Sequence, residues 1–212
     1  MKKLGKYRLT LILVGLAVII GASLPAFMTA SCLTRQQTPA EIRALENLRA
    51  MTRGGVLPSE DVVARVESDF PRTKAAALAR IVRARIRINA KDFAGAAALL
   101  DSSVIRDYSL LGDYALFMRA DALWQAGKPG DARVVYEQLL SDYPASFRVR
   151  EARLRAANMM RLTGNASAVP FVLKDLVAKD DPTALLLTAT AYERITTRDE
   201  SEGIDAIERP AE

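Results

Sequence analysis

The feature that most constrains the fold is a four-residue motif that recurs along the chain at nearly constant spacing. Its copies are SDFP, RDYS, SDYP and KDDP, which end at Pro71, Ser109, Pro144 and Pro182 and are therefore 38, 35 and 38 residues apart. Proline stops a helix because it has no amide hydrogen to donate and its ring clashes with the preceding turn. A repeat of this length is typical of helical hairpins that stack on one another.

Between the copies of the motif, apolar residues follow the spacing of amphipathic helices. The clearest unit runs from Asp113 to Pro144, and in its first half Leu116, Ala120 and Leu123 form one apolar stripe. Gly127 then favours a turn, because glycine adopts the positive φ that often ends a helix. Strand-like alternation of polar and apolar residues is not found in the sequence. These patterns predict an all-α fold, a solenoid of helical hairpins.

This unit resembles a tetratricopeptide repeat (TPR) over its full length. The neighbouring units are weaker matches in the same register, with Ala84 and Ala96 at the two small positions of one and Ala157 and Gly164 kept in the other. The resemblance implies a TPR-like solenoid of about three to four units. The N-terminal segment adds a signal or anchor helix to the expected fold. The residues on the signature positions of the family are Ala120, Gly127, Ala132, Tyr136, Leu139 and Pro144.

The resemblance also implies that the first helix of each hairpin lines a groove that binds a partner protein. A cluster of Tyr, Phe and Trp bordered by Arg and Asp has the composition of a binding hot spot. The alternative is that Phe117 and Trp124 are buried against the preceding unit, which is the commoner place for an aromatic side chain. The candidate partner-binding residues are Arg85, Tyr114, Phe117, Asp121, Trp124, Asn158 and Arg161.

The N-terminus has the layout of a secretory signal. Four basic residues precede an almost purely apolar stretch from Leu9 to Met28, and small residues follow it. Thr29-Ala30-Ser31 before Cys32 resembles the lipobox of bacterial lipoprotein precursors, which implies lipidation of Cys32. An uncleaved membrane anchor and plain cleavage are the two alternatives. All three predict a location outside the cytoplasm, and we expect a chain anchored to a membrane of the bacterial envelope and facing the periplasm.

Composition excludes several classes of function once the N-terminal segment is set aside. Of the 30 basic and 25 acidic residues, four basic ones lie in residues 1–31, so 26 basic and 25 acidic residues remain. This balance disfavours nucleic acid as a partner. The sequence has no histidine, the commonest general base and metal ligand. We therefore predict no catalytic residue, cofactor or metal site, and the protein is not expected to be an enzyme.

Arginines gather on two helices, and two interpretations of them remain open. Arg80, Arg83 and Arg87 share one helical face, and Arg148 to Arg155 surround another helix start. These side chains could meet anionic lipids or an acidic partner. Alternatively, they form a solvated face whose aliphatic stems cover apolar surface.

The expected function is that of a non-catalytic scaffold tethered to the envelope, which binds envelope proteins whose identity the sequence does not give. The repeats are also similar to the helical arm of soluble lytic murein transglycosylases, particularly in YEQLLSDYP and EARLRAANMMRLTG. The alternative is therefore a truncated arm of such a peptidoglycan enzyme without its catalytic domain, with the peptidoglycan machinery as its neighbour. The domains expected are a signal peptide or anchor (1–31), the lipidated Cys with a tether and a leading helix (32–57), TPR-like repeats (58–196) and an acidic tail (197–212).

We predict that the chain is cleaved between Ser31 and Cys32 and acylated on Cys32. A bacterial lipoprotein carries several acyl chains, and these anchor stably where one chain alone binds only marginally. Cys32→Ser should abolish lipid incorporation and leave an unprocessed precursor in the membrane. Intact mass spectrometry checks this, and a wild-type protein that still begins at Met1, or one cut elsewhere without lipid, would contradict it.

Overall fold

The computed structural model of the 212-residue chain describes residues 37–208, with side chains to residue 197. The predicted signal or anchor helix and Cys32 lie outside the described residues. Internal contacts divide the chain into two units, Met1–Ile42 and Arg43–Glu212, and the helical repeats belong to the second. The described part holds ten α-helices, one 3₁₀ turn and no strand, which confirms the all-α prediction. The helices are α2 (Pro39–Thr52), α3 (Glu60–Asp69), α4 (Lys74–Asn89), α5 (Phe93–Leu100), α6 (Ser103–Tyr108), α7 (Gly112–Gln125), α8 (Pro129–Asp142), α9 (Val149–Leu162), α10 (Val169–Val177) and α11 (Pro182–Glu208), with η1 at Ala166–Ala168.

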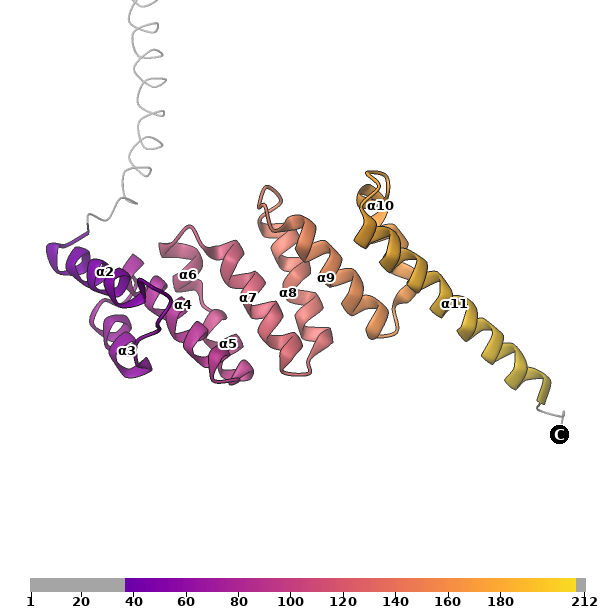
Figure 1. Cartoon of the computed structure of the whole chain (residues 1–212), viewed down its shortest axis with the longest axis horizontal. Coiled ribbons are helices and arrows are strands. Elements are labelled where there is room, and N and C mark those ends of the chain that lie inside the picture. The colour runs from indigo at the N-terminus through magenta and orange to yellow at the C-terminus, as the bar shows by residue number, and fades with distance from the viewer. Residues whose placement is uncertain (1–36, 209–212) are drawn as a thin grey trace, which may run out of the picture. The chain divides into compact units, whose positions relative to one another are not determined.

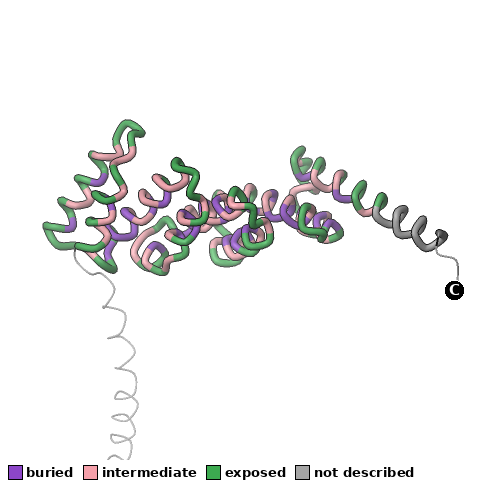
Figure 2. The backbone as a smooth tube through the Cα atoms, turned by 90° about the horizontal axis from the view of Figure 1, so that it is seen from below, coloured by how far each residue is buried: buried purple, intermediate pink, exposed green. Residues whose placement is uncertain are grey.

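Consecutive helices pack as hairpins that follow one another along the second unit (Figure 1). Helices α4 and α5, α7 and α8, and α9 and α10 pair within hairpins, while α5 packs on α7 and α8 on α9 between them. Buried residues recur along the helices where they face their neighbours, and exposed residues dominate the loops (Figure 2). The core is therefore a series of small clusters, as expected when each repeat contacts only the next.

Alanine occupies fully buried positions between paired helices. Ala120 and Ala132 are completely buried in one cluster with Tyr136 and Leu139. A methyl side chain lets two helix backbones approach, and the ring of Tyr136 fills the space beyond. The arrangement matches the small and large positions that the TPR resemblance implied.

The first helix of each hairpin ends in the same hydrogen-bonded turn. After α7, Gly127 has φ 76°, the Lys128 amide donates to the Leu123 carbonyl at 2.9 Å, and the Gly127 amide donates to the Trp124 carbonyl at 3.0 Å. This is the Schellman arrangement, which favours glycine because its left-handed residue would otherwise carry a strained Cβ. The same turn follows α4, where Lys91 takes the left-handed position with φ 61°.

The arginine stripe of α4 is paired with glutamates of α3. Arg80 and Arg83 both hold Glu67, and Arg83 and Arg87 both hold Glu60. Hydrogen bonds from Arg87 and Arg83 hold the pKa of Glu60 below its ordinary value, against the opposing effect of burial. These arginines therefore link two helices of the fold.

Two elements differ in extent from the sequence expectation. The RDYS motif was expected to be a break between hairpins, but its first three residues lie in a short helix, α6, that begins at Ser103 and ends at Tyr108. The Ser102 side chain accepts a hydrogen bond from the Val104 amide at 3.3 Å and so caps this helix. Helix α11 continues to Glu208, into the segment expected to be an acidic tail. Within the described part of the chain, none of the helices combines the length and the apolarity needed to span a bilayer.

The two helix-ending turns predict a reciprocal pair of stability changes. Lys91→Gly should stabilise the protein, because a left-handed conformation costs an L-residue roughly 1–2 kcal/mol. The gain should be smaller than this, because glycine loses more backbone entropy on folding than lysine does. Gly127→Lys should destabilise it by roughly 1 kcal/mol through the backbone alone, since no atom lies within 4 Å of a Cβ built at Gly127. Chemical denaturation measures both, and a loss of stability in Lys91→Gly would contradict the assigned turn.

Candidate partner-binding face

The structure places the predicted groove residues on the first helices of three successive hairpins. Arg85 lies on α4, the residues from Tyr114 to Trp124 lie on α7, and Asn158 and Arg161 lie on α9. Arg85 and Tyr114 are brought together across the hairpin boundary, where Arg85 Nη1 donates a hydrogen bond to the Tyr114 hydroxyl at 3.4 Å. These helices therefore share one side of the repeat array along at least part of their length.

Arg148 lies at the centre of this side, although the sequence analysis did not select it as a binding residue. The guanidinium carbon of Arg148 lies 4.7 Å from the ring centroid of Tyr114, 5.3 Å from that of Phe117 and 4.7 Å from that of Phe147. A cation over an aromatic face is attracted by the ring quadrupole, which makes that face electronegative. We call Arg85, Tyr114, Phe117, Phe147 and Arg148 the aromatic–arginine surface. The cluster of arginines around the start of α9 was the available signal, but the sequence did not single out one of them.

Arg148 is held by rings and not by a carboxylate. Its Nε–H is buried and has no hydrogen-bond partner among the described residues, and none of the ion pairs between described side chains includes it. A guanidinium carries five N–H donors in a fixed plane and suits a carboxylate well. Arg148 thus presents a positioned cation beside Phe147, whose side chain is 83% exposed.

Asp121 has a structural role on this side. Its Oδ1 accepts hydrogen bonds from the Tyr136 hydroxyl and from Arg155 Nη1, the latter at 2.8 Å. Arg155 Nε in turn donates to Glu151 Oε1 at 2.9 Å. Burial, and to a smaller extent the hydrogen bond to Asp121, raises the pKa of Tyr136 far above its ordinary value, so its hydroxyl remains a donor. Asp121 therefore joins α7, α8 and α9 through one of its two carboxylate oxygens.

The two aromatic residues of α7 for which burial was the alternative occupy different environments. Phe117 is half-buried and packs edge-on against Tyr136, with ring centroids 5.7 Å apart at 69°. Trp124 is 37% exposed at the far end of the helix. The burial alternative therefore describes Phe117, whose ring contacts both Tyr136 in the core and Arg148, whereas Trp124 is partly exposed.

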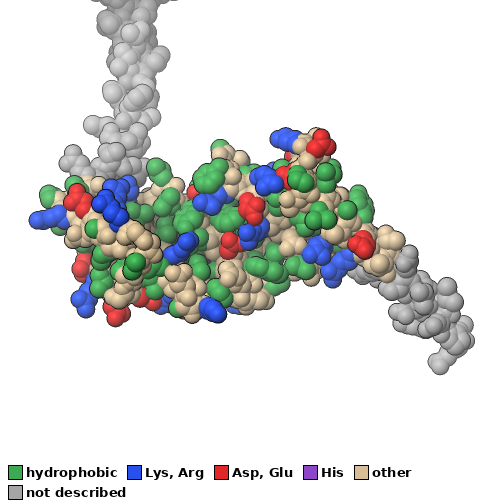
Figure 3. Space-filling model, in the orientation of Figure 1, with side chains coloured by type: hydrophobic (Ala, Val, Ile, Leu, Met, Phe, Trp, Pro, Cys, Tyr) green, Lys and Arg blue, Asp and Glu red, His purple; other side chains and the backbone are tan. Residues whose placement is uncertain are grey.

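Asn158 and Arg161 contact each other and none of the other predicted residues through a hydrogen bond or ion pair. Arg161 donates from Nε and Nη2 to Asn158 Oδ1 at 3.3 and 2.9 Å, an i, i+3 contact along α9. On the face shown in Figure 3, charged and apolar side chains of the described residues are interspersed, and they form no continuous basic stripe. Among the side chains that the structure describes, residues 37–197, no cluster of ligands is suited to a metal ion.

The sequence of the repeat at the centre of this face is similar to a known repeat family. Residues 115–156, which run from α7 through α8 into α9, match the tetratricopeptide repeat family model. The protein is TPR-like. No curated protein and no solved structure shows a significant match to the chain. The match covers the TPR segment and does not address the likeness to lipoproteins or to lytic transglycosylases.

The different environments of the two α7 aromatics predict different effects on folding. Phe117→Ala should destabilise the protein by roughly 2–3 kcal/mol, somewhat less than a fully buried phenylalanine. Trp124→Ala should destabilise it less than Phe117→Ala, because 37% of Trp124 is exposed and that part contributes no burial. Urea denaturation of both variants tests this, and an equal loss in the two would mean that Trp124 belongs to the core.

Proposed function

We propose that the protein is a non-catalytic TPR-like scaffold, tethered to the bacterial cell envelope, that binds a partner protein through the aromatic–arginine surface and Trp124. The TPR match supports a role in protein–protein interaction, because repeats of this family generally bind other proteins. The observation that carries the proposal is Arg148, a cation fixed by three rings and left without a carboxylate partner among the described residues.

The chemistry of this surface indicates what the partner offers. Phe147 and Trp124 supply exposed aromatic area, and aromatic residues together with Arg carry much of the energy in protein interfaces. Arg85 and Arg148 both contact Tyr114, Arg85 at its hydroxyl and Arg148 at its ring. A partner segment with apolar side chains and an acidic group complements this arrangement.

Tethering to the envelope rests on the N-terminal sequence. The charged start, the apolar stretch and the lipobox-like residues before Cys32 support lipidation, membrane anchoring and a location facing the periplasm. The partner is accordingly an envelope protein, and the peptidoglycan machinery is a natural neighbour. The absence of histidine from the sequence supports a role without catalysis.

Trp124→Ala and Arg148→Gln should each weaken partner binding, Trp124→Ala by at least ~2 kcal/mol if Trp124 is a hot spot. The full-length protein is retrieved with its partners from cross-linked envelopes, and the partners are quantified by mass spectrometry. Phe171→Ala is the matched control, because Phe171 is an exposed aromatic (74%) on α10, away from the aromatic–arginine surface.

The proposal requires partners that the wild type and Phe171→Ala retain and that the two surface variants lose while keeping the wild-type circular dichroism. The same partners captured equally by all four proteins would refute it. Loss of helicity together with binding would instead assign these residues to folding.

A further inference from the structure

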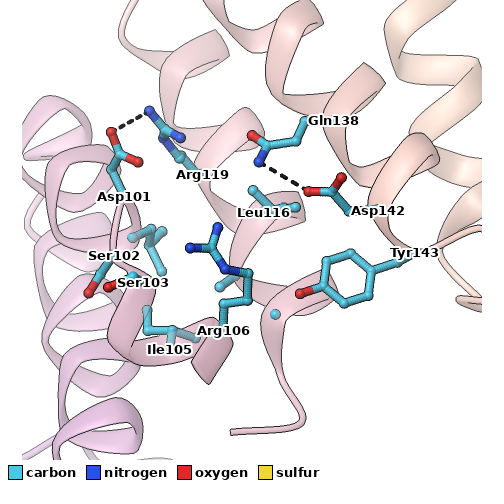
Figure 4. Close-up of a pocket in the computed structure, with 13 residues that line it drawn as sticks. Asp101, Ser102, Ser103, Ile105, Arg106, Leu116, Arg119, Gln138, Asp142 and Tyr143 are labelled. Atoms are coloured by element: carbon cyan, nitrogen blue, oxygen red, sulfur yellow. Dashed lines mark hydrogen bonds and ion pairs between the residues drawn. The ribbon is translucent and has the colours of Figure 1, made fainter. Parts of the chain in front are cut away.

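A cavity of about 140 Å³ lies between the end of α5, the short helix α6, α7 and the end of α8 (Figure 4). It is unrelated to the aromatic–arginine surface. Gly112, Leu116 and Arg119 of α7 line it, whereas Tyr114 and Phe117 of the same helix contact Arg148. At about 100° per residue, these two sets of positions face opposite sides of α7.

The first polar group of the cavity is the Arg119 guanidinium. Its Nη2 donates to Asp101 Oδ2 at 2.7 Å, which fixes the side chain. Its Nε–H is buried and has no hydrogen-bond partner among the described residues. A buried donor without an acceptor is costly, so native structures nearly always supply one. The Nε atom itself is closed off from solvent, so an acceptor in the cavity, which Arg119 lines, would meet the terminal nitrogens of its guanidinium.

Arg106 brings a second guanidinium to the same cavity. Its ion pair is with the adjacent Asp107, a contact of 3.4 Å from Nε that leaves the two terminal nitrogens available. In Figure 4 the guanidinium of Arg106 extends between Arg119 and Tyr143. The cavity is therefore lined by two guanidinium groups. Among the described side chains, that of Arg106 has only one ion pair, the 3.4 Å contact with Asp107.

Tyr143 adds a neutral donor at the edge of the cavity. A Cβ added at Gly112 would overlap the Tyr143 hydroxyl, so the absence of a side chain at Gly112 is what lets the ring lie there. Burial raises the pKa of Tyr143, and the hydroxyl is consequently protonated at neutral pH. It can donate a hydrogen bond to an anion held by the arginines.

The remaining lining limits the charge and the size of a ligand. Asp101 is engaged by Arg119, and Asp142 accepts a hydrogen bond from Gln138 Nε2 at 3.2 Å. These two carboxylates would repel a dianion such as phosphate more than a monoanion. Leu116 and Ile105 supply apolar walls. The volume is well below the roughly 300–1,000 Å³ of pockets for drug-sized molecules, so the cavity suits a single small group.

We propose that this cavity binds a carboxylate group, with the guanidinium groups of Arg119 and Arg106 and the hydroxyl of Tyr143 as donors. A carboxylate has one negative charge and two acceptor oxygens, and guanidinium groups bind it through short, charge-assisted hydrogen bonds. The methylene groups beside it would lie on the apolar walls. Two sources share this chemistry, a small free acid and an acidic side chain of a peptide.

Nuclear magnetic resonance of the full-length protein in neutral detergent tests the proposal through the Arg119 Nε–Hε signal, assigned by its loss in Arg119→Lys. The probes are sodium propionate, the blocked peptide acetyl-Ala-Glu-Ala-amide, its neutral partner acetyl-Ala-Gln-Ala-amide, and inorganic phosphate. Saturable shifts with propionate identify a free acid as a ligand, and saturable shifts with the Glu peptide alone identify an acidic side chain. Either result supports the site, provided that the Gln peptide and phosphate bind more weakly.

Arg106→Gln should weaken binding of the preferred probe by about tenfold, the size expected for losing one charge-assisted hydrogen bond. Tyr143→Phe should weaken it less, because the lost donor is neutral. Arg133→Gln is the matched control, since Arg133 lies on α8, pairs with Glu137 and does not line the cavity. No saturable shift with either acid, equal binding of the Gln peptide or of phosphate, or an affinity of Arg106→Gln equal to that of Arg133→Gln would overturn the proposal.

Discussion

The structure depends on the close approach of paired helices at alanine. Ala84 and Ala96 in one hairpin, and Ala120 and Ala132 in the next, are completely buried. Each contributes little apolar area by itself, but each allows two backbones and their larger neighbours to come into contact. A core made in this way cannot be supplied by one hairpin alone, because its clusters lie as much between hairpins as within them. Stacking is therefore a condition of folding for every unit.

Charged side chains reinforce the same boundaries. Arg119 of α7 holds Asp101 at the end of α5, Arg155 of α9 holds Asp121 of α7, and Arg150 of α9 holds Asp181 before α11. Exposed pairs of this kind stabilise little individually. Their positions matter more than their energies, because each joins one hairpin to the next. The surfaces described above are assembled from several helices and depend on how the hairpins stack.

Periodicity sufficed to predict the helical hairpins, because the spacing of apolar residues determines which faces of two helices pack together. The TPR resemblance placed Arg85 and Tyr114 on one side, where they do meet. It could not single out Arg148, since several arginines stand near the start of α9 and only the fold decides which one reaches the rings. Nor could it assign Asp121 to Tyr136 and Arg155, a contact across three helices. Helix α6 was missed because six residues are too few to show a period, and contacts with α4 and α7 hold it.

The origin of Arg148 has a consequence for how the protein responds to a partner. This residue precedes α9, yet the rings of Tyr114 and Phe117 that hold it belong to α7, and the whole of α8 lies between. The cation reaches its rings only while α9 is docked, so opening of the later hairpins would dismantle the surface without touching α7 itself. By linkage, a molecule that bridges α7 and Arg148 must raise the free energy of that opening. A molecule bound to this surface would hold α7 and α9 together. The region of the repeat array with the slowest amide hydrogen exchange would then extend further toward the C-terminal helices.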